Sequence, residues 1–238
     1  MKEKFSNIIS HRGYHGNGVV ENTMLAFSKS ISYSLPIELD VYLTKDSKLV
    51  VFHDSNLKRL MGVDKKIEEC NYSELLKYSF LGGEGTIPLF SEVLELVSGK
   101  VPLLIEVKRA KNYHKTCCAL MDSLLNYSGK VQIQSFDFRI VRWFLKKKKY
   151  LAGLLISSNP KEQYYWYYLL VNSAFFVKHF VHPNFVSYDL RGVPTPFLKE
   201  IRAYGIPIYL WTIRTKKDLK LAHKYGDYYI AEELDSFN

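Results

Sequence analysis

Short apolar runs rich in β-branched residues alternate along the chain with longer segments whose apolar positions recur at helical spacing. The strand-like runs are residues 8–10, 36–41, 49–52, 101–107, 131–134, 151–156, 185–188, 207–211 and 228–231. The helix-like segments are residues 22–33, 90–97, 113–127, 137–147, 161–180, 196–204 and 216–224. Repeated strand–helix alternation predicts a parallel sheet. Eight strands remain if 49–52 is an excursion after the second strand, which favours the α/β class and a closed (β/α)8 TIM barrel.

The stretch 54–86 breaks this alternation, because it is polar and glycine-containing. It predicts a small subdomain inserted after the second strand. With 238 residues the chain suits one barrel, which needs about 250 residues, and we expect a single domain over 1–238. Thr215 is an expected helix N-cap, and Gly205 and Gly226 follow helices where a C′ glycine belongs.

The sequence Ile-Glu-Leu-Asp-Val places two carboxylates, Glu38 and Asp40, in a strand that should be buried. Side chains two apart on a strand share a face, so these two point the same way. The same device recurs at Glu106 and Lys108, at the end of a later strand. Buried charges are costly unless they are paired or bind a metal. Three convergent carboxylates therefore predict a divalent cation held by oxygen ligands.

Simpler explanations exist for both pairs. Glu38 and Asp40 could lie on the solvated face of an antiparallel strand, and Glu106 and Lys108 could form a structural ion pair. The alternation of strands and helices disfavours the first explanation, because both faces of a parallel sheet are covered. All four residues also fall near strand ends, where barrel active sites lie.

Two histidines follow apolar strands directly, each beside a charged residue, as His11-Arg12 and His53-Asp54. A lone histidine is more often a satisfied core residue, but two imidazoles flanking a phosphodiester suit general acid–base catalysis. Arg12 offers a planar fork for phosphate oxygens. Lys108 offers a point charge where negative charge builds on the phosphoryl group.

Composition narrows the range of partners. The net charge of +9 favours anionic partners, namely phosphorylated substrates, nucleic acid or an acidic membrane surface. The hydrophobic share of 47% indicates a globular core. Three cysteines, two of them adjacent, do not suggest a disulfide framework, so a cytoplasmic protein is expected. The first residues lack the apolar stretch of a signal peptide, and none is expected.

A series of motifs occurs in order along the chain. They are His11-Arg12-Gly13, Glu21-Asn22-Thr23, Glu38-Leu-Asp40, His53-Asp54, Glu106-Val-Lys108, Ser135-Phe136-Asp137 and Trp211-Thr212. In this combination the sequence resembles the glycerophosphodiester phosphodiesterase family. The resemblance implies a (β/α)8 barrel with a small insertion and metal-dependent hydrolysis of glycerophosphodiesters to an alcohol and glycerol 3-phosphate.

The resemblance also implies a role for each of eight side chains. These are acid–base catalysis by His11 and His53, metal binding by Glu38, Asp40 and Glu106, phosphate binding by Arg12 and Lys108, and packing against the glycerol by Trp211. The implied cofactor is one divalent ion, Mg2+ or Ca2+, which an all-oxygen shell does not distinguish.

Two alternative functions stay open: a lysophospholipase D-type phosphodiesterase acting on membrane lysolipids, and a barrel that binds phosphodiesters or lipid headgroups without turnover. Residues 139–180, where the family motifs fade, combine lysines with tyrosines. They could be ordinary barrel helices, or they could make weak peripheral contact with an anionic membrane. Binding to nucleic acid is not expected, because no nucleic-acid motif accompanies the charge.

Overall fold

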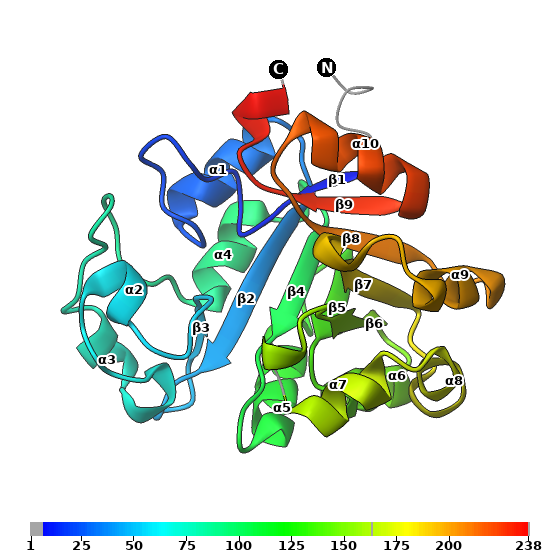
Figure 1. Cartoon of the computed structure of the whole chain (residues 1–238). Helices are drawn as coiled ribbons and strands as arrows, with labels where there is room; N and C mark the ends of the chain where they lie inside the picture. Colours follow the sequence, from blue (N-terminus) through cyan, green and yellow to red (C-terminus); the bar gives the residue numbers. More distant parts are fainter. Residues whose placement is uncertain (1–6, 163, 238) are drawn as a thin grey trace. The chain divides into compact units, whose positions relative to one another are not determined.

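The structure is a computed structural model that describes residues 7–162 and 164–237 (Figure 1). It divides into two compact units: one spans Ser10–Val131, and the other joins the first nine residues of the chain to Gln132–Asn238. Residues 1–6, for which the sequence predicts no signal peptide, lie outside the described residues. The predicted single-domain organisation stays a prediction.

The sheet of the Ser10–Val131 unit is built around β2 (Ile37–Leu43). This strand pairs in parallel with β4 (Leu103–Val107) and with the last residue of β1 (Ile8–Ser10), and antiparallel with β3 (Leu49–Val51). Figure 1 shows β3 and β4 on either side of β2. The antiparallel β3 confirms the predicted excursion after the second strand.

Three longer helices belong to the same unit: α1 (Met24–Ser32), α4 (Phe90–Val97) and α5 (Tyr113–Ser123). The side chain of Thr23 accepts a hydrogen bond from the Ala26 N–H, 3.3 Å away, which caps α1 and starts it two residues later than predicted. Helix α5 is four residues shorter than the predicted 113–127 segment.

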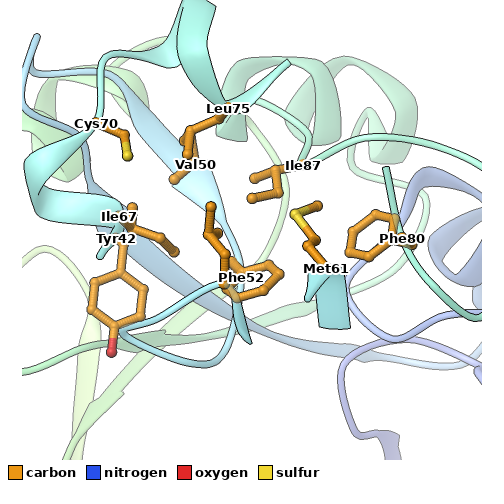
Figure 2. Packing of buried hydrophobic residues seen from close by; sticks show 10 residues of the cluster. Tyr42, Val50, Phe52, Met61, Ile67, Cys70, Leu75, Phe80 and Ile87 are labelled. Atoms are coloured by element: carbon orange, nitrogen blue, oxygen red, sulfur yellow. The ribbon is translucent and has the colours of Figure 1, made fainter. Parts of the chain in front are cut away.

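The insertion folds into short elements with an apolar centre of their own. These elements are α2 (Lys58–Met61), η1 (Ile67–Glu69) and α3 (Tyr72–Leu75). Their side chains form one cluster with residues of β2 and of β3 and its flank, which Figure 2 shows from close by. The buried members are Tyr42, Val50, Phe52, Leu57, Met61, Ile67, Cys70, Leu75, Phe80 and Ile87. The rings of Phe52 and Phe80 stack with centroids 6.4 Å apart. The insertion, although largely polar, thus packs on β2 and β3 through its few apolar residues.

In the described part of the second unit, five parallel strands pair in the order β5–β6–β7–β8–β9. The strands are β5 (Val131–Ser135), β6 (Leu151–Ile156), β7 (Phe185–Asp189), β8 (Ile208–Ile213) and β9 (Tyr228–Ala231). The helices are α6 (Phe138–Lys147), α7 (Tyr165–Val171), α8 (Ala174–Phe176), α9 (Pro196–Ala203) and α10 (Lys216–Tyr225), with η2 (Pro160–Glu162), η3 (Val177–Val181), η4 (Leu190–Gly192) and η5 (Leu234–Phe237). Together the two units contain all nine predicted strands.

The single helix predicted over 161–180 is wrong. The chain instead forms η2, α7, α8 and the π-helical turn η3, and residue 163 lies outside the described residues. The break falls at Asn172 and Ser173. The Ser173 hydroxyl accepts from the Phe176 N–H at 3.3 Å and starts a new turn, since such side chains compete with the helix for backbone groups.

Two of the three predicted helix-end signals are confirmed. Thr215 caps α10 in a capping box with Asp218, and Gly205 follows α9 with a φ of 71°. Gly226 is the C-cap of α10 but has an extended backbone. Its role is packing, because a Cβ there would lie 2.8 Å from the Leu210 side chain. None of the helices in the described part of the chain is long and apolar enough to cross a membrane.

Candidate active site

Three buried carboxylates converge between β2 and β4: two lie among the first four residues of β2 and the third is the penultimate residue of β4. Glu38, Asp40 and Glu106 each offer one oxygen within 4.8 Å of the oxygens offered by the other two. The strand register explains the convergence, because Asp40 and Glu106 are direct partners on neighbouring parallel strands. On the opposite face of β2, the fully buried Leu39 and Val41 pack into the apolar core. Alternation along β2 therefore separates the charged cluster from the core.

Lys108 lies between two of these carboxylates. Its Nζ is 2.7 Å from an oxygen of Asp40 and 2.7 Å from an oxygen of Glu106. Burial alone would lower the pKa of Lys108, but the two carboxylates raise it above its usual value. The ammonium group therefore stays protonated at neutral pH and supplies a fixed positive charge.

The pKa values of the three carboxylates are shifted in different directions. Burial, reinforced by the charges of Asp40 and Glu106, raises the pKa of Glu38 well above its usual value. Burial also leaves the pKa of Glu106 raised, although Lys108 opposes it. For Asp40, burial is outweighed by the charges of Lys108 and His53, which hold its pKa well below the usual range. Glu38 and Glu106 therefore bind a proton more readily than exposed glutamates do, and Asp40 less readily than an exposed aspartate.

The turn after β1 brings Arg12 to this cluster. Arg12 has a φ of 53°, and its backbone N–H donates to Glu38 Oε2 at 3.0 Å. Its Nε lies 3.5 Å from Asp40 Oδ2. The next residue must be glycine, because Gly13 has a φ of 80° and a Cβ there would lie 2.9 Å from the Cβ of Ala26. The motif His-Arg-Gly therefore forms a tight turn that places the guanidinium of Arg12 beside the carboxylates.

The Glu21-Asn22-Thr23 motif supports this turn. Asn22 is fully buried and its side-chain amide donates to Asp40 Oδ2 at 2.8 Å. Glu21 Oε1 accepts from Arg12 Nη1 at 2.8 Å. Burial would raise the pKa of Glu21, but the hydrogen bond and charge of Arg59, with the charge of Arg12, lower it overall. The motif thus orients both a candidate metal ligand and the candidate phosphate-binding arginine.

His53 follows β3 and is held by its neighbour. Its Nδ1 lies 2.6 Å from Asp54 Oδ1, which leaves Nε2 as the ring nitrogen that can face a substrate. Asp54 in turn accepts from Arg59 Nε at 2.5 Å. The N–H of Phe52, the residue before His53, donates to the Asp40 carbonyl oxygen at 3.1 Å, so His53 follows directly on a residue that is hydrogen-bonded to the strand carrying Asp40.

The other two predicted site residues occupy different surroundings. His11 is buried, and its Nε2 lies 3.9 Å from Glu38 Oε2. Trp211 is on β8 in the other compact unit, where its ring meets Phe136 edge-on with centroids 5.7 Å apart. Its buried Nε1 has no hydrogen-bond acceptor among the described residues. Packing of Trp211 against a glycerol stays a prediction.

Sequence reasoning assigned no role to Glu21, Asn22, Asp54 or Arg59. The structure connects all four to the cluster or to His53. For Glu21, Asn22 and Asp54, membership of the quoted motifs was the available signal, whereas Arg59 lies five residues beyond the nearest motif.

The donor set fits a hard divalent cation. Carboxylate oxygens are the ligands that Mg2+ and Ca2+ prefer, and three of them lie together here. Burial is the main cause of the raised pKa values of Glu38 and Glu106, with neighbouring carboxylates adding to it, and a bound cation would favour the ionised forms of both.

The chain is similar in structure and in sequence to known proteins. A phosphodiesterase of known structure from Thermotoga maritima, described as a glycerophosphodiester phosphodiesterase, is 28% identical, superposes with a TM-score of 0.74, and is matched over 94% of this chain and 93% of its own. The fold is therefore an α/β (β/α)8 TIM barrel, as the sequence predicts. The sequence matches the Glycerophosphoryl diester phosphodiesterase family over residues 11–228, and the chain belongs to that family.

Two curated relatives are similar over shorter stretches. The glycerophosphodiester phosphodiesterase of Bacillus altitudinis is 37% identical over 144 residues, which are 56% of this chain and 54% of that protein. The human Lysophospholipase D GDPD1 is 39% identical over 125 residues, which are 47% of this chain and 39% of that protein. These matches thus span about half or less of either relative.

Proposed function

We propose that this protein is a metal-dependent phosphodiesterase that hydrolyses glycerophosphodiesters to an alcohol and glycerol 3-phosphate. The observation that carries the proposal is the buried convergence of Glu38, Asp40 and Glu106 within 4.8 Å, beside a histidine that is held by a carboxylate. Membership of the family and the name of the Bacillus altitudinis relative support the same reaction.

The three carboxylates would hold one Mg2+ or Ca2+ ion. When bound, such an ion polarises phosphoryl oxygens and lowers the pKa of an attacking hydroxyl. Arg12 and Lys108 would bind the phosphate, since both keep their positive charge while buried among carboxylates. Their fixed charges would stabilise the negative charge that develops on the phosphoryl group.

The two histidines would move the protons. His53 has its Nδ1 occupied by Asp54, so its Nε2 would exchange a proton with the substrate. His11, beside Glu38, would serve the other side of the ester. One imidazole accepts a proton from the nucleophile and the other donates a proton to the leaving alkoxide.

Release of glycerol 3-phosphate tests this proposal. The purified protein is incubated with glycerophosphocholine and with glycerophosphoethanolamine after chelation, and then with Mg2+, Ca2+ or Mn2+ restored separately. We expect release only with a restored metal. Absence of product with every metal and substrate, despite binding of the diester, would support a non-catalytic binding barrel instead.

A second candidate is a lysophospholipase D activity. The observation that favours it is the 39% identity with the human Lysophospholipase D GDPD1. The same site would serve, because both substrates present a phosphodiester to the metal. Production of lysophosphatidate and choline from lysophosphatidylcholine, faster than turnover of glycerophosphocholine, would establish this substrate class.

A further inference from the structure

The segment that follows β6 exposes a concentration of large apolar side chains. Of the fourteen such side chains that are exposed among the described residues, six lie within residues 164–180, and each is more than half exposed. They are Tyr164, Tyr165, Trp166, Leu169, Phe175 and Phe180. We refer to these six residues as the aromatic face. A cavity of about 520 Å³ opens beside it and shares Leu169 and Phe175 as lining residues.

Helix α7, which carries Tyr165, Trp166 and Leu169 of this face, is packed against its own unit on its other side. The hydroxyl of Tyr167, a buried residue of α7, donates to the Phe136 carbonyl and accepts from the Phe138 N–H at 3.2 Å. The rings of Phe138 and Tyr167 stack with centroids 5.9 Å apart. Helix α7 is therefore well packed on one side while the apolar side chains on its other side stay exposed. Exposed apolar patches of this kind mark interaction surfaces.

The same region contains most of the net positive charge of the chain. Residues 137–191 hold nine Lys and Arg against three Asp and Glu, a net +6 of the total +9. Arg139 and Arg191 end two related sequences, Ser-Phe-Asp-Phe-Arg and Ser-Tyr-Asp-Leu-Arg. Each is held by the buried aspartate two residues earlier, yet each stays more than half exposed. Arg139 directly follows Phe138, whose ring packs on Tyr167 of α7, so its cationic side chain belongs to the same region as the aromatic face.

We propose that the aromatic face docks on a bilayer that contains anionic lipids. Tyrosine and tryptophan prefer the membrane–water interface, and a basic surface is drawn to anionic headgroups. A second copy of this chain is a poorer occupant, because two surfaces of net positive charge would be brought together. The proposal does not depend on the catalytic function, so binding should survive chelation of the metal.

Vesicle co-sedimentation tests the proposal. The intact protein is mixed with vesicles of phosphatidylcholine alone, or of equal parts phosphatidylcholine and phosphatidylglycerol. We expect pelleting with the anionic vesicles, little pelleting with the neutral ones, and release as salt is raised. A double variant, Tyr165→Ser with Trp166→Ser, should weaken binding about tenfold or more.

Matched variants distinguish binding through the aromatic face from nonspecific binding by any exposed apolar or basic side chain. Leu125→Ser removes an equally exposed apolar side chain in the other unit and should leave binding unchanged. Lys161→Gln with Lys178→Gln should weaken binding more than Lys217→Gln with Lys220→Gln on α10. Turnover of soluble glycerophosphocholine should be equal in all of these variants, which shows that they are folded and that any failure concerns docking alone.

Several outcomes would overturn the proposal. At low salt, the wild-type protein could be recovered equally in the supernatant with anionic and with neutral vesicles. This result alone would exclude the proposed docking, whatever the variants show. Equal weakening by Leu125→Ser and by the aromatic double variant excludes this face as the contact. A concentration-dependent dimer that the double variant abolishes would assign the face to self-association.

Discussion

Glu21 and Arg59, which are 38 positions apart in sequence, are joined by two hydrogen bonds of 2.7 and 3.1 Å. Arg59 also donates to Asp54, which holds His53, and Glu21 also accepts from Arg12. An unbroken line of hydrogen bonds thus connects the candidate acid–base imidazole with the candidate phosphate-binding guanidinium. Residues that orient catalytic groups in this way commonly affect activity strongly.

Arg59→Ala should lower kcat about ten- to a hundredfold, because it leaves both Asp54 and Glu21 without their shared partner. Steady-state kinetics with a glycerophosphodiester would measure this, with Lys58→Ala as the control, since Lys58 is adjacent and 73% exposed. Added guanidinium should restore part of the lost turnover. A purely structural role for Arg59 would instead lower Tm without any response of kcat to guanidinium.

His53→Ala should reduce turnover about 10²- to 10⁴-fold, the usual contribution of general acid–base catalysis. Its matched control is His223→Ala on α10, which lies in the other unit and packs on Tyr229. Near-normal turnover in a folded His53→Ala protein would remove the assignment of this imidazole as acid or base.

Metal removal should abolish turnover, and Asp40→Asn or Glu106→Gln should raise the metal concentration needed to restore it. Because the pKa of Glu38 is raised by burial and its carboxylate neighbours, protons compete with the cation at this ligand. Apparent metal affinity should therefore fall as the pH is lowered. Calorimetric titration of Mg2+ and Ca2+ at two pH values measures this; identical affinities at both would contradict it.

Acid should destabilise the fold partly through Glu21 and Asp54. Burial opposes ionisation of both, but their arginine and histidine partners hold each folded pKa below its usual value. Their ionised forms therefore stabilise the protein above the unfolded pKa of about 4, and that stability is lost as the pH falls further. Urea midpoints at about pH 6 and about pH 3 should differ less in Glu21→Gln than in the wild type.

The apolar centre of the insertion should contribute to global stability. Leu75→Ala removes a fully buried side chain and should cost about 2–5 kcal/mol of unfolding free energy. Leu76→Ala is the control, because the neighbouring leucine is 48% exposed. A single unfolding transition by fluorescence and circular dichroism in both variants would agree with the predicted single domain; an early separate transition in Leu75→Ala alone would not.

The sequence predicted the strands well, because alternation and β-branched runs are local signals. β2 and β4 lie within two residues of their predicted bounds, and the register between them brings Asp40 beside Glu106. The helix over 161–180 was predicted wrongly, since hydrophobicity is continuous there and the break depends on the capping side chain of Ser173.

The supporting residues of the site were beyond sequence reasoning for a different physical reason. The contact of Arg59 with Glu21 joins the insertion to the first loop, and no local pattern encodes a pairing across 38 positions. Nor does any sequence signal report that Tyr165 and Trp166 stay exposed, because the same aromatic run could equally have packed inward. The cytoplasmic location and the membrane contact stay predictions.

Seven of the eight side chains predicted for the site come from residues 11–108, within a single compact unit. The eighth side chain, Trp211, lies on β8 and belongs to the other unit. The proposed metal-binding, phosphate-binding and acid–base groups therefore belong to one contiguous stretch of the chain, so substitutions in the surface loops of the other unit can accumulate without altering any of them.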